Sequence, residues 1–233
     1  SYLVHGLDNE VENVEKARRY AGSLGLEGRV SFEGWEGRDL PYIDNLVNLI
    51  VLDQPAGVPM KEVMRVLCPN GAAYVKQQGQ WRMTRKPRPQ EIDEWTHYLY
   101  DASNNAVAHD TVVGPPEGLQ WTCAPEFARS HEHFGSVSAM VSSGGRVFYI
   151  VDEGPISSVF LEPRWKLVAR NAFSGVLLWE HPISNWESQL RGFRSGPPEI
   201  GRRLVAGDDC VYAALGYGEP VVVLDAADGQ RRN

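Results

Sequence analysis

The spacing of apolar residues changes near the middle of this chain, and that change constrains the fold more than any other feature. Up to about residue 80, stretches of helical spacing alternate with short apolar runs, whereas from Gly118 onward apolar residues recur at every second position. The first pattern is typical of helices between buried strands, and the second of half-buried strands. A chain of 233 residues is long enough for one large domain or two small ones with proper cores. We therefore expect an α/β part followed by an all-β part.

The first part, residues 1–80, predicts strands that alternate with helices. One helix is expected where apolar residues recur at helical spacing, at Val11, Val14, Ala17, Ala21 and Leu24. Asn9 is its expected N-cap, because Glu12 stands three residues later as in a capping box. A list of further expected elements comprises strands over 29–32, 46–52 and 72–76 and a helix over about 60–67. This order of elements predicts a parallel sheet.

Residues 81–119 predict a charged connector. Two prolines near its start stand among four basic side chains, Arg82, Arg85, Lys86 and Arg88. The stretch 93–100 is too aromatic for a free linker, so we expect a short helix that packs on a neighbour. Its aromatic side chains could clamp a ligand, but such clusters more often close a domain interface, which we favour for Trp95, Tyr98 and Tyr100.

Residues 120–233 predict short strands separated by Gly and Asp turns, and they contain a repeat. The turn Asn171–Gly175 is matched by Asp225–Gly229, 54 residues later, while the strand start Arg146–Tyr149 is matched by Cys210–Ala213, 64 residues later. The first unit therefore carries about ten extra residues, which we assign to the loop 152–166. Such a loop either lines a binding face or is a tolerated insertion.

The segment 167–179 resembles the blade motif of quinoprotein-type, eight-bladed β-propellers, the PQQ-like repeats. In that motif Gly175 supplies a positive φ, Asn171 bonds its own turn, and Trp179 fills the gap between blades with its N–H satisfied. The resemblance implies that residues 120–233 form blades of an incomplete propeller. For Asn171 and Trp179 we favour this structural role over a catalytic one.

The propeller resemblance does not imply that pyrroloquinoline quinone is bound. The dehydrogenases of that group use an adjacent Cys–Cys pair, whereas the three cysteines here, Cys68, Cys123 and Cys210, are far apart. They form no disulfide framework, and buried thiols are the simplest interpretation. Many relatives keep the propeller as a binding scaffold.

Residues 2–76 resemble the class I S-adenosylmethionine (SAM)-dependent methyltransferases. The ordered motifs are the strand end Val4–Asp8, the loop Glu36–Tyr42, the strand Asn45–Val51 and the helix and turn Lys61–Gly71. The resemblance implies that the Asp8 carboxylate takes both ribose hydroxyls of SAM and that Glu36 lies near the adenine amino group.

Asp53 is a third candidate for the cofactor site. With Gln54 and Pro55 it falls where amino-group methylases carry an Asp-Pro-Pro-Tyr-like motif. The Gly-rich turn that holds the methionine end of the cofactor does not precede Asp8, and antiparallel last strands are not evident after Lys76. We therefore expect either a fragment or a relic used for packing, and no catalytic residue is assigned.

Other chemistry is less favoured. His131 and His133 would share one face of a strand and could bind a metal with His97 or His109, but isolated pairs of this kind arise by chance, and no metal site is predicted. No Gly-x-Ser-x-Gly nucleophile elbow occurs. The net charge of −7 without a basic stripe argues against nucleic acid, and the longest apolar run, residues 46–52, is too short to span a bilayer.

The order of the modules, with the stretch 93–105 between them, resembles large proteins of planctomycete-type bacteria. No signal peptide is visible, so the compartment stays open between the cytoplasm and, by this resemblance, the periplasm or cell envelope. We expect a propeller that binds a protein or small molecule on its face and carries a methyltransferase-like domain, as part of a larger protein. The alternatives are a quinoprotein-like oxidoreductase, an active SAM-dependent methyltransferase when full length, and a pure interaction protein, so enzyme activity stays open.

Overall fold

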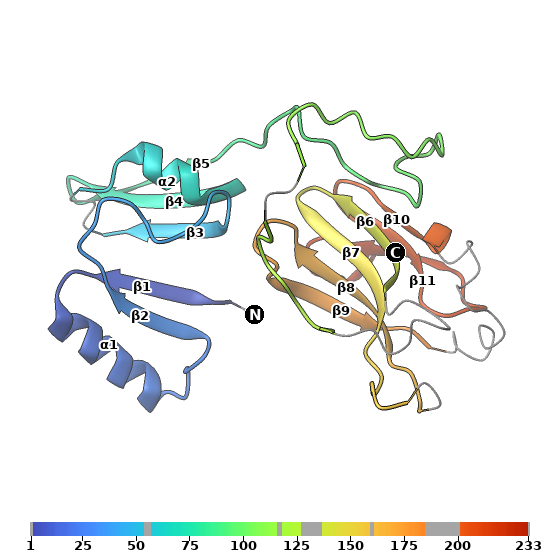
Figure 1. Cartoon of the computed structure of the whole chain (residues 1–233), viewed down its shortest axis with the longest axis horizontal. Coiled ribbons are helices and arrows are strands. Elements are labelled where there is room, and N and C mark those ends of the chain that lie inside the picture. The colour runs from blue at the N-terminus through green and yellow to red at the C-terminus, as the bar shows by residue number, and fades with distance from the viewer. Residues whose placement is uncertain are drawn as a thin grey trace. The chain divides into compact units, whose positions relative to one another are not determined.

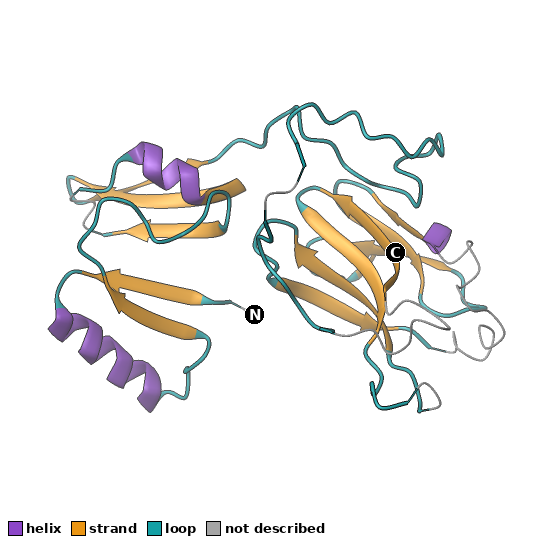
Figure 2. Cartoon of the chain, viewed as in Figure 1, coloured by secondary structure: helices purple, strands orange, loops and turns teal. Residues whose placement is uncertain are grey.

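The computed structural model describes residues 2–53, 57–115, 118–126, 137–158, 161–184 and 201–232. The chain divides into two compact units, residues 1–87 and 88–233 (Figure 1). Helices α1 and α2 both belong to the first unit, while strands dominate the second (Figure 2). The expected change from α/β to all-β structure is therefore confirmed. No helix in the described ranges combines the length and the apolar character that crossing a membrane requires.

Within its described residues, the first unit contains two sheets, and no strand of one is hydrogen-bonded to a strand of the other. Its elements are β1 (Val4–Asp8), α1 (Val11–Ser23), β2 (Val30–Gly34), β3 (Val47–Leu52), α2 (Met60–Val66), β4 (Leu67–Gln77) and β5 (Gln80–Arg85). Strands β1 and β2 pair in parallel, β3 and β4 pair in parallel, and β5 joins β4 antiparallel. The expected parallel pairing is present, as two separate parallel pairs.

Two expectations for this unit are wrong. The N-cap of α1 is Glu10 rather than Asn9, and it makes no side-chain cap bond; the Asp8 carboxylate accepts the Glu10 N–H instead, at 2.8 Å. Residues 80–85, most of which we placed in the connector, form β5 and supply an antiparallel strand after Lys76. Every residue of β5 is exposed, so the strand contributes no side chain to the core.

One face of the three-stranded sheet forms the core of the first unit. Ile50 on β3 and the β4 side chains Ala73 and Val75 pack with Val63 and Val66 of α2. Side chains of the β1–β2 part are partly buried on the same cluster, namely Leu7 and Trp35. A hydrogen bond of 2.9 Å between the Tyr42 hydroxyl and His5 Nδ1 also joins the two parts.

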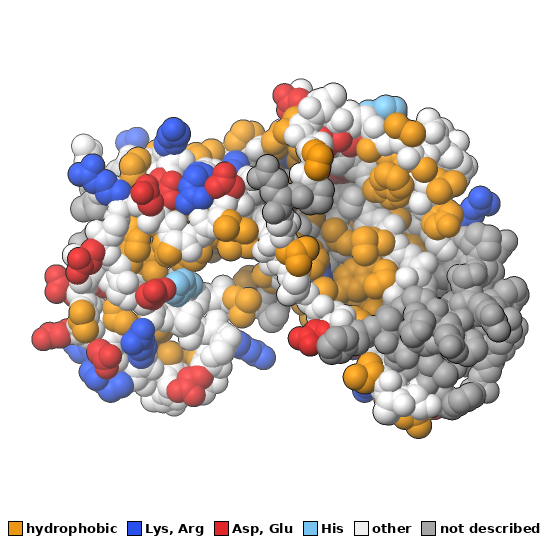
Figure 3. Space-filling view, in the orientation of Figure 1, with side chains coloured by type: hydrophobic (Ala, Val, Ile, Leu, Met, Phe, Trp, Pro, Cys, Tyr) orange, Lys and Arg blue, Asp and Glu red, His pale blue; other side chains and the backbone are white. Residues whose placement is uncertain are grey.

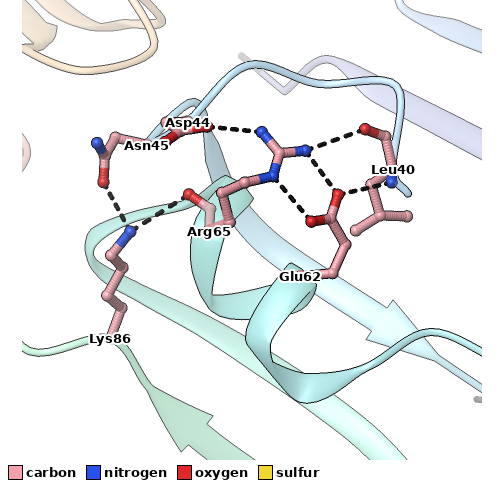
Figure 4. A network of polar contacts seen from close by, with 6 residues as sticks. All are labelled: Leu40, Asp44, Asn45, Glu62, Arg65 and Lys86. Atoms are coloured by element: carbon pink, nitrogen blue, oxygen red, sulfur yellow. Dashed lines mark hydrogen bonds and ion pairs between the residues drawn. The ribbon is translucent and has the colours of Figure 1, made fainter. Parts of the chain in front are cut away.

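A polar network fixes α2 to the loop before β3 (Figure 4). Arg65 donates from Nε and Nη2 to the two carboxylate oxygens of Glu62, at 2.8 and 2.6 Å, and the Leu40 N–H donates to Glu62 at 2.8 Å. These donors, Arg65 first, lower the pKa of Glu62 from 4.5 to about 2 against the opposing effect of burial. Arg65 also donates to Asp44 at 2.6 Å.

Lys86 extends this network to the end of the unit. Its ammonium donates to Asn45 Oδ1 at 2.7 Å and to the Arg65 carbonyl at 3.3 Å, and burial lowers its pKa. Asn45 has a φ of +61°, a left-handed conformation that Asn tolerates better than most residues. The turn into β3 is thus held by a residue that follows β5.

The described residues of the second unit form two four-stranded antiparallel sheets, in which neighbours along the chain are neighbours in the sheet. The first comprises β6 (Val137–Ser143), β7 (Arg146–Asp152), β8 (Trp165–Asn171) and β9 (Leu177–Pro182). The second comprises β10 (Leu204–Ala206), β11 (Cys210–Ala214), β12 (Val221–Asp225) and β13 (Arg231–Arg232), after the short helix η1 (Gly201–Arg203). One hydrophobic cluster includes buried side chains of both sheets, among them Phe148, Leu167, Val211 and Leu224.

The aromatic stretch 93–100 is not the expected helix. Its backbone instead pairs with strand residues, because the Trp95 carbonyl accepts the Ser142 N–H of β6 at 2.7 Å and the Thr96 carbonyl accepts the Ala206 N–H of β10 at 2.9 Å. A strand edge leaves N–H groups free for such pairing, and this outweighs the local tendency to form a helix. The stretch therefore bridges the two sheets.

In the space-filling view, charged side chains are conspicuous on the first unit (Figure 3).

Replacing Arg65 by Met should destabilise the first unit by about 2 kcal/mol, because it removes the charged donors of the largely buried Glu62 carboxylate. Since the pKa of Glu62 is lower in the folded state, its stabilisation is present above pH 4.5 and is lost as the pH falls toward 2. Denaturant unfolding at several pH values measures both effects, and the variant should show the flatter pH dependence.

The control is Arg19→Met, which removes a helical ion pair with Glu15 whose side chains are 72% and 52% exposed. Such a pair contributes at most about 0.5 kcal/mol. Equal losses in the two variants would contradict a stabilising role of the Glu62–Arg65 network.

Candidate functional site

Asp8 and Glu36 lie at the carboxyl ends of two neighbouring parallel strands. Asp8 ends β1 and stands opposite Gly34, the last residue of β2, and its carbonyl accepts the Trp35 N–H at 2.9 Å. Glu36 follows in the loop and is exposed. In open α/β sheets, ligands bind outside the carboxyl ends of the strands. The structure therefore brings these two predicted residues to one end of one sheet.

The Asp8 carboxylate also holds the start of α1. Beside its bond to the Glu10 N–H, its two oxygens accept the Asn13 side-chain amide at 3.3 Å each. A carboxylate offers about four acceptor sites, and these three contacts use three of them, so two ribose hydroxyls can be accepted only where the Asn13 amide gives up one oxygen. Asp8 is half-buried, and a helix N-terminus beside it favours negative charge.

Asp53 lies in a different setting. It follows β3 of the other sheet and forms an ion pair of 2.6 Å with Lys76 of β4. Lys76 in turn lies 5.6 Å from the Trp81 ring centroid. No contact among the described residues links Asp53 with Asp8 or Glu36, and Gln54 and Pro55 lie outside the described residues. Asp53 thus already has a cationic partner.

The histidine pattern at 131–133 lies outside the described residues. Of its two suggested companions, His97 contacts Thr96 Oγ1 through Nδ1 at 2.8 Å, and His109 contacts the Tyr100 hydroxyl through Nδ1 at 2.9 Å. Within the described ranges, no group of three or more His, Cys, Asp or Glu side chains is arranged to hold a metal ion.

Tyr100 is the centre of a polar cluster that sequence analysis missed. It is 6% exposed, with a φ of +72°, and its hydroxyl donates to Asp93 at 2.6 Å. Because the phenol has one proton, His109 Nδ1 is the donor in the second bond. Asp93 and burial raise the pKa of Tyr100 to about 12. These contacts hold the two ends of the segment 93–109 together, and no sequence motif predicts them.

The Asp225–Gly229 turn of the second sheet is clasped by two side chains of β9. Trp179 Nε1 donates to the Ala226 carbonyl at 3.1 Å, and His181 Nε2 lies 2.6 Å from the Gly229 carbonyl oxygen. A Cβ on Gly229 would come within 2.7 Å of the Trp179 ring, and Gly229 has a φ of +75°. Trp179 thus ties the first sheet of the second unit to the sheet that follows it, as predicted.

The same contact between a tryptophan and a turn, which we call the clasp, occurs once more, at the turn 171–175 of the first sheet. Trp121 Nε1 donates to the Ala172 carbonyl at 2.9 Å, and a Cβ on Gly175 would come within 2.6 Å of the Trp121 ring. Asn171 Oδ1 accepts the Phe173 and Ser174 N–H groups at 3.1 and 2.8 Å, as predicted for this turn. Sequence analysis missed Trp121, although it stands about one repeat before Trp179.

Comparisons with known proteins give limited matches. No family model matches the sequence, and no curated protein matches it either. Among solved structures, the [4+2]-cyclase SpnF is 25% identical over 33% of this chain and 32% of that chain, with a TM-score of 0.30. The YcgJ protein from Bacillus subtilis is 28% identical over 30% and 32%, with a TM-score of 0.28. The match thus spans about a third of the length of these two proteins, and TM-scores of this size do not establish a shared fold.

Replacing Gly229 by Ala should destabilise the second unit by about 2–4 kcal/mol. The new Cβ meets the Trp179 ring, and a left-handed backbone conformation alone costs an L-residue about 1–2 kcal/mol. Thermal or denaturant unfolding measures the loss. Gly218→Ala is the matched control, because a Cβ there meets nothing within 4 Å; it should stay within about 0.5 kcal/mol of the parent. A tolerated Gly229→Ala would show that the clasp is loose.

Proposed function

We propose that this chain is part of a binding scaffold built from repeated β-sheets, a propeller of the PQQ-like kind, which carries a SAM-dependent methyltransferase-like unit. The recurrence of the clasp is the observation that carries the proposal. Trp121 and Trp179 each lie against the glycine of a turn and donate to the carbonyl of an alanine in that turn. One contact used twice indicates a repeating assembly.

The direction of the clasp favours a ring. Each Trp comes earlier in the chain than the turn that it contacts. The contact therefore joins the tryptophan side of one repeat to the turn side of the next repeat, which are different surfaces. Such head-to-tail contacts close into rings or continue as filaments, whereas two-fold contacts stop at a pair. Four-stranded sheets arranged radially are the blades of a propeller. We propose that the loops around such a ring bind a protein or a small molecule.

In the first unit we propose SAM as the ligand, held through its adenosine part. Asp8 lies at the carboxyl end of β1, where a ribose diol would take the place of the Asn13 amide on its carboxylate, and Glu36, in the loop after the neighbouring strand β2, is the proposed partner of the adenine amino group. The ion pair with Lys76 makes Asp53 the weaker candidate. Bound SAM would supply the methyl group, and these side chains would orient its nucleoside.

The quinoprotein alternative gains no support from the cysteine chemistry. Cys68, Cys123 and Cys210 are all free thiols, and none has a neighbouring cysteine in the sequence. We therefore do not propose a quinone cofactor.

Asp8→Asn tests the proposed cofactor site, because Asn can still accept the Glu10 N–H but cannot accept both ribose hydroxyls. Calorimetric titration of the full-length protein with S-adenosylhomocysteine should give binding that this change weakens about tenfold or more, the effect of losing about 1.4 kcal/mol.

Asp39→Asn, in the loop that contains Glu36, is the matched control and should leave the dissociation constant for S-adenosylhomocysteine unchanged. Absence of any binding heat in the parent protein would refute the SAM proposal. Equal effects of the two substitutions would show that the protein binds the ligand but that Asp8 does not contact it.

A further inference from the structure

The three-stranded sheet of the first unit has a bare edge at β5. Strand β5 pairs with β4 (Figure 1) and with no other described strand, and all six of its residues are exposed. A strand edge presents unpaired N–H and C=O groups, to which an extended segment can add as a further strand. The chemistry of this edge therefore decides which kind of segment it accepts.

The hydrogen bonding of β5 to β4 shows which of its backbone groups point outward. The Lys86 N–H, directly after β5, donates to the Gly71 carbonyl of β4 at 2.9 Å. Along an antiparallel ladder, residues that bond to the partner strand alternate with residues that do not. The even-numbered residues of β5 therefore bond to β4, and Trp81, Met83 and Arg85 direct their N–H and C=O groups to the free edge.

A row of apolar side chains crosses the sheet and ends at this edge. Val51 stands opposite Tyr74, and Tyr74 stands opposite Met83. These side chains are 59%, 39% and 51% exposed, and Trp81, two residues before Met83 on the same face, is 48% exposed. Directly opposite residues of neighbouring strands contact each other. An added strand should therefore present apolar side chains opposite Met83 and Trp81.

Two arginines give the edge its charge. Among the described residues, neither Arg82 nor Arg85 has an ion-pair partner, whereas Lys76 on the neighbouring strand is paired with Asp53 at 2.6 Å. Strand β5 contains no acidic residue, although the whole chain has a net charge of −7. Because successive side chains of a strand point to opposite faces, the edge offers one free cation on each face of the sheet.

These charges oppose pairing with a second copy of β5. Two such strands side by side would gather four guanidinium groups and no carboxylate, and charges on an edge strand are a common device against self-pairing. A nucleic acid fits the edge less well than a protein segment does, because it has no backbone N–H to donate to the outward carbonyls and the net negative charge of the chain repels it.

We propose that the free edge of β5 binds an acidic protein segment as an added antiparallel strand. The antiparallel direction gives the more stable pairing per residue. The segment places apolar side chains opposite Trp81 and Met83 and carboxylates opposite Arg82 and Arg85, where cross-strand charge-assisted hydrogen bonds form. Read from its N-terminus, it has an acidic residue, any residue, an apolar residue, an acidic residue and an apolar residue. The scaffold and cofactor functions proposed above do not involve β5, so the two sets of proposals stand or fall separately.

A fluorescently labelled peptide that contains Glu-Thr-Ile-Glu-Ile tests the proposal on the 233-residue chain. Fluorescence anisotropy should show saturable binding. With saturating peptide, the outward N–H groups of Trp81, Met83 and Arg85 should exchange with solvent about tenfold more slowly or less, because they become hydrogen-bonded. The N–H groups of Arg82 and Thr84, which already bond to β4, should change less.

Two matched peptides separate the contributions of charge and backbone. Replacing both Glu residues by Lys should abolish binding, because like charges then lie opposite each other. N-methylation of the first Ile keeps every side chain but removes the N–H that donates to the Met83 carbonyl, so it should weaken binding about tenfold or more. Equal binding of either peptide and the parent peptide overturns the proposal, and so does a parent peptide that does not bind.

Arg82→Glu should weaken binding about tenfold or more. Arg19→Glu on α1 is the matched control, because it makes the same change of charge at a side chain that is 72% exposed, and it should leave the dissociation constant for the peptide unchanged. Equal effects of the two substitutions overturn the proposal. Binding that leaves the outward N–H groups unprotected, or tighter binding of a single-stranded DNA oligonucleotide, overturns it too.

Discussion

An indole ring lying on a glycine is the contact on which the second unit depends. At Gly229 and Gly175 the backbone is left-handed and a Cβ would collide with Trp179 or Trp121, so each turn must have glycine for two independent reasons. The indole N–H then donates to a carbonyl of the same turn. The Trp179 ring is buried with its polar group satisfied, and it belongs to the cluster of buried side chains that the two sheets share.

The first unit is organised by charge rather than by a repeated contact. Glu62 and Arg65 on one short helix reach the loop at Leu40 and Asp44, and Lys86 closes the arrangement from the other side. Partly buried ion pairs stabilise less by attraction than by fixing one geometry, because removing either partner leaves the other unpaired. Here that geometry sets the approach to β3, whose carboxyl end precedes Asp53.

How far the sequence predicted this structure depended on whether the signal was local. The roles of Asn171, Gly175 and Trp179 were predictable because the blade motif that they resemble lies within nine consecutive residues. Asp8 was placed at a strand end by the resemblance of residues 2–76 to the class I methyltransferases. The expected helix at 93–100 failed because its carbonyls pair with strands that lie more than 40 residues downstream. The pair of Asp53 with Lys76 needed the register of β3 on β4, which no short motif encodes, and β5 buries no side chain that could reveal it.

The Asp8 carboxylate supports the start of α1 and is also the proposed ligand of a nucleoside. It accepts the N–H that opens α1 and, in the proposed site, the hydroxyls of a nucleoside. If ligand binding at this carboxylate changes the equilibrium for ordering the first turn of α1, then ordering of that turn changes the affinity for the ligand by the same factor. Ordering of the first turn of α1 would therefore be coupled to ribose binding at Asp8, and the order of this backbone segment would report whether the sugar is bound.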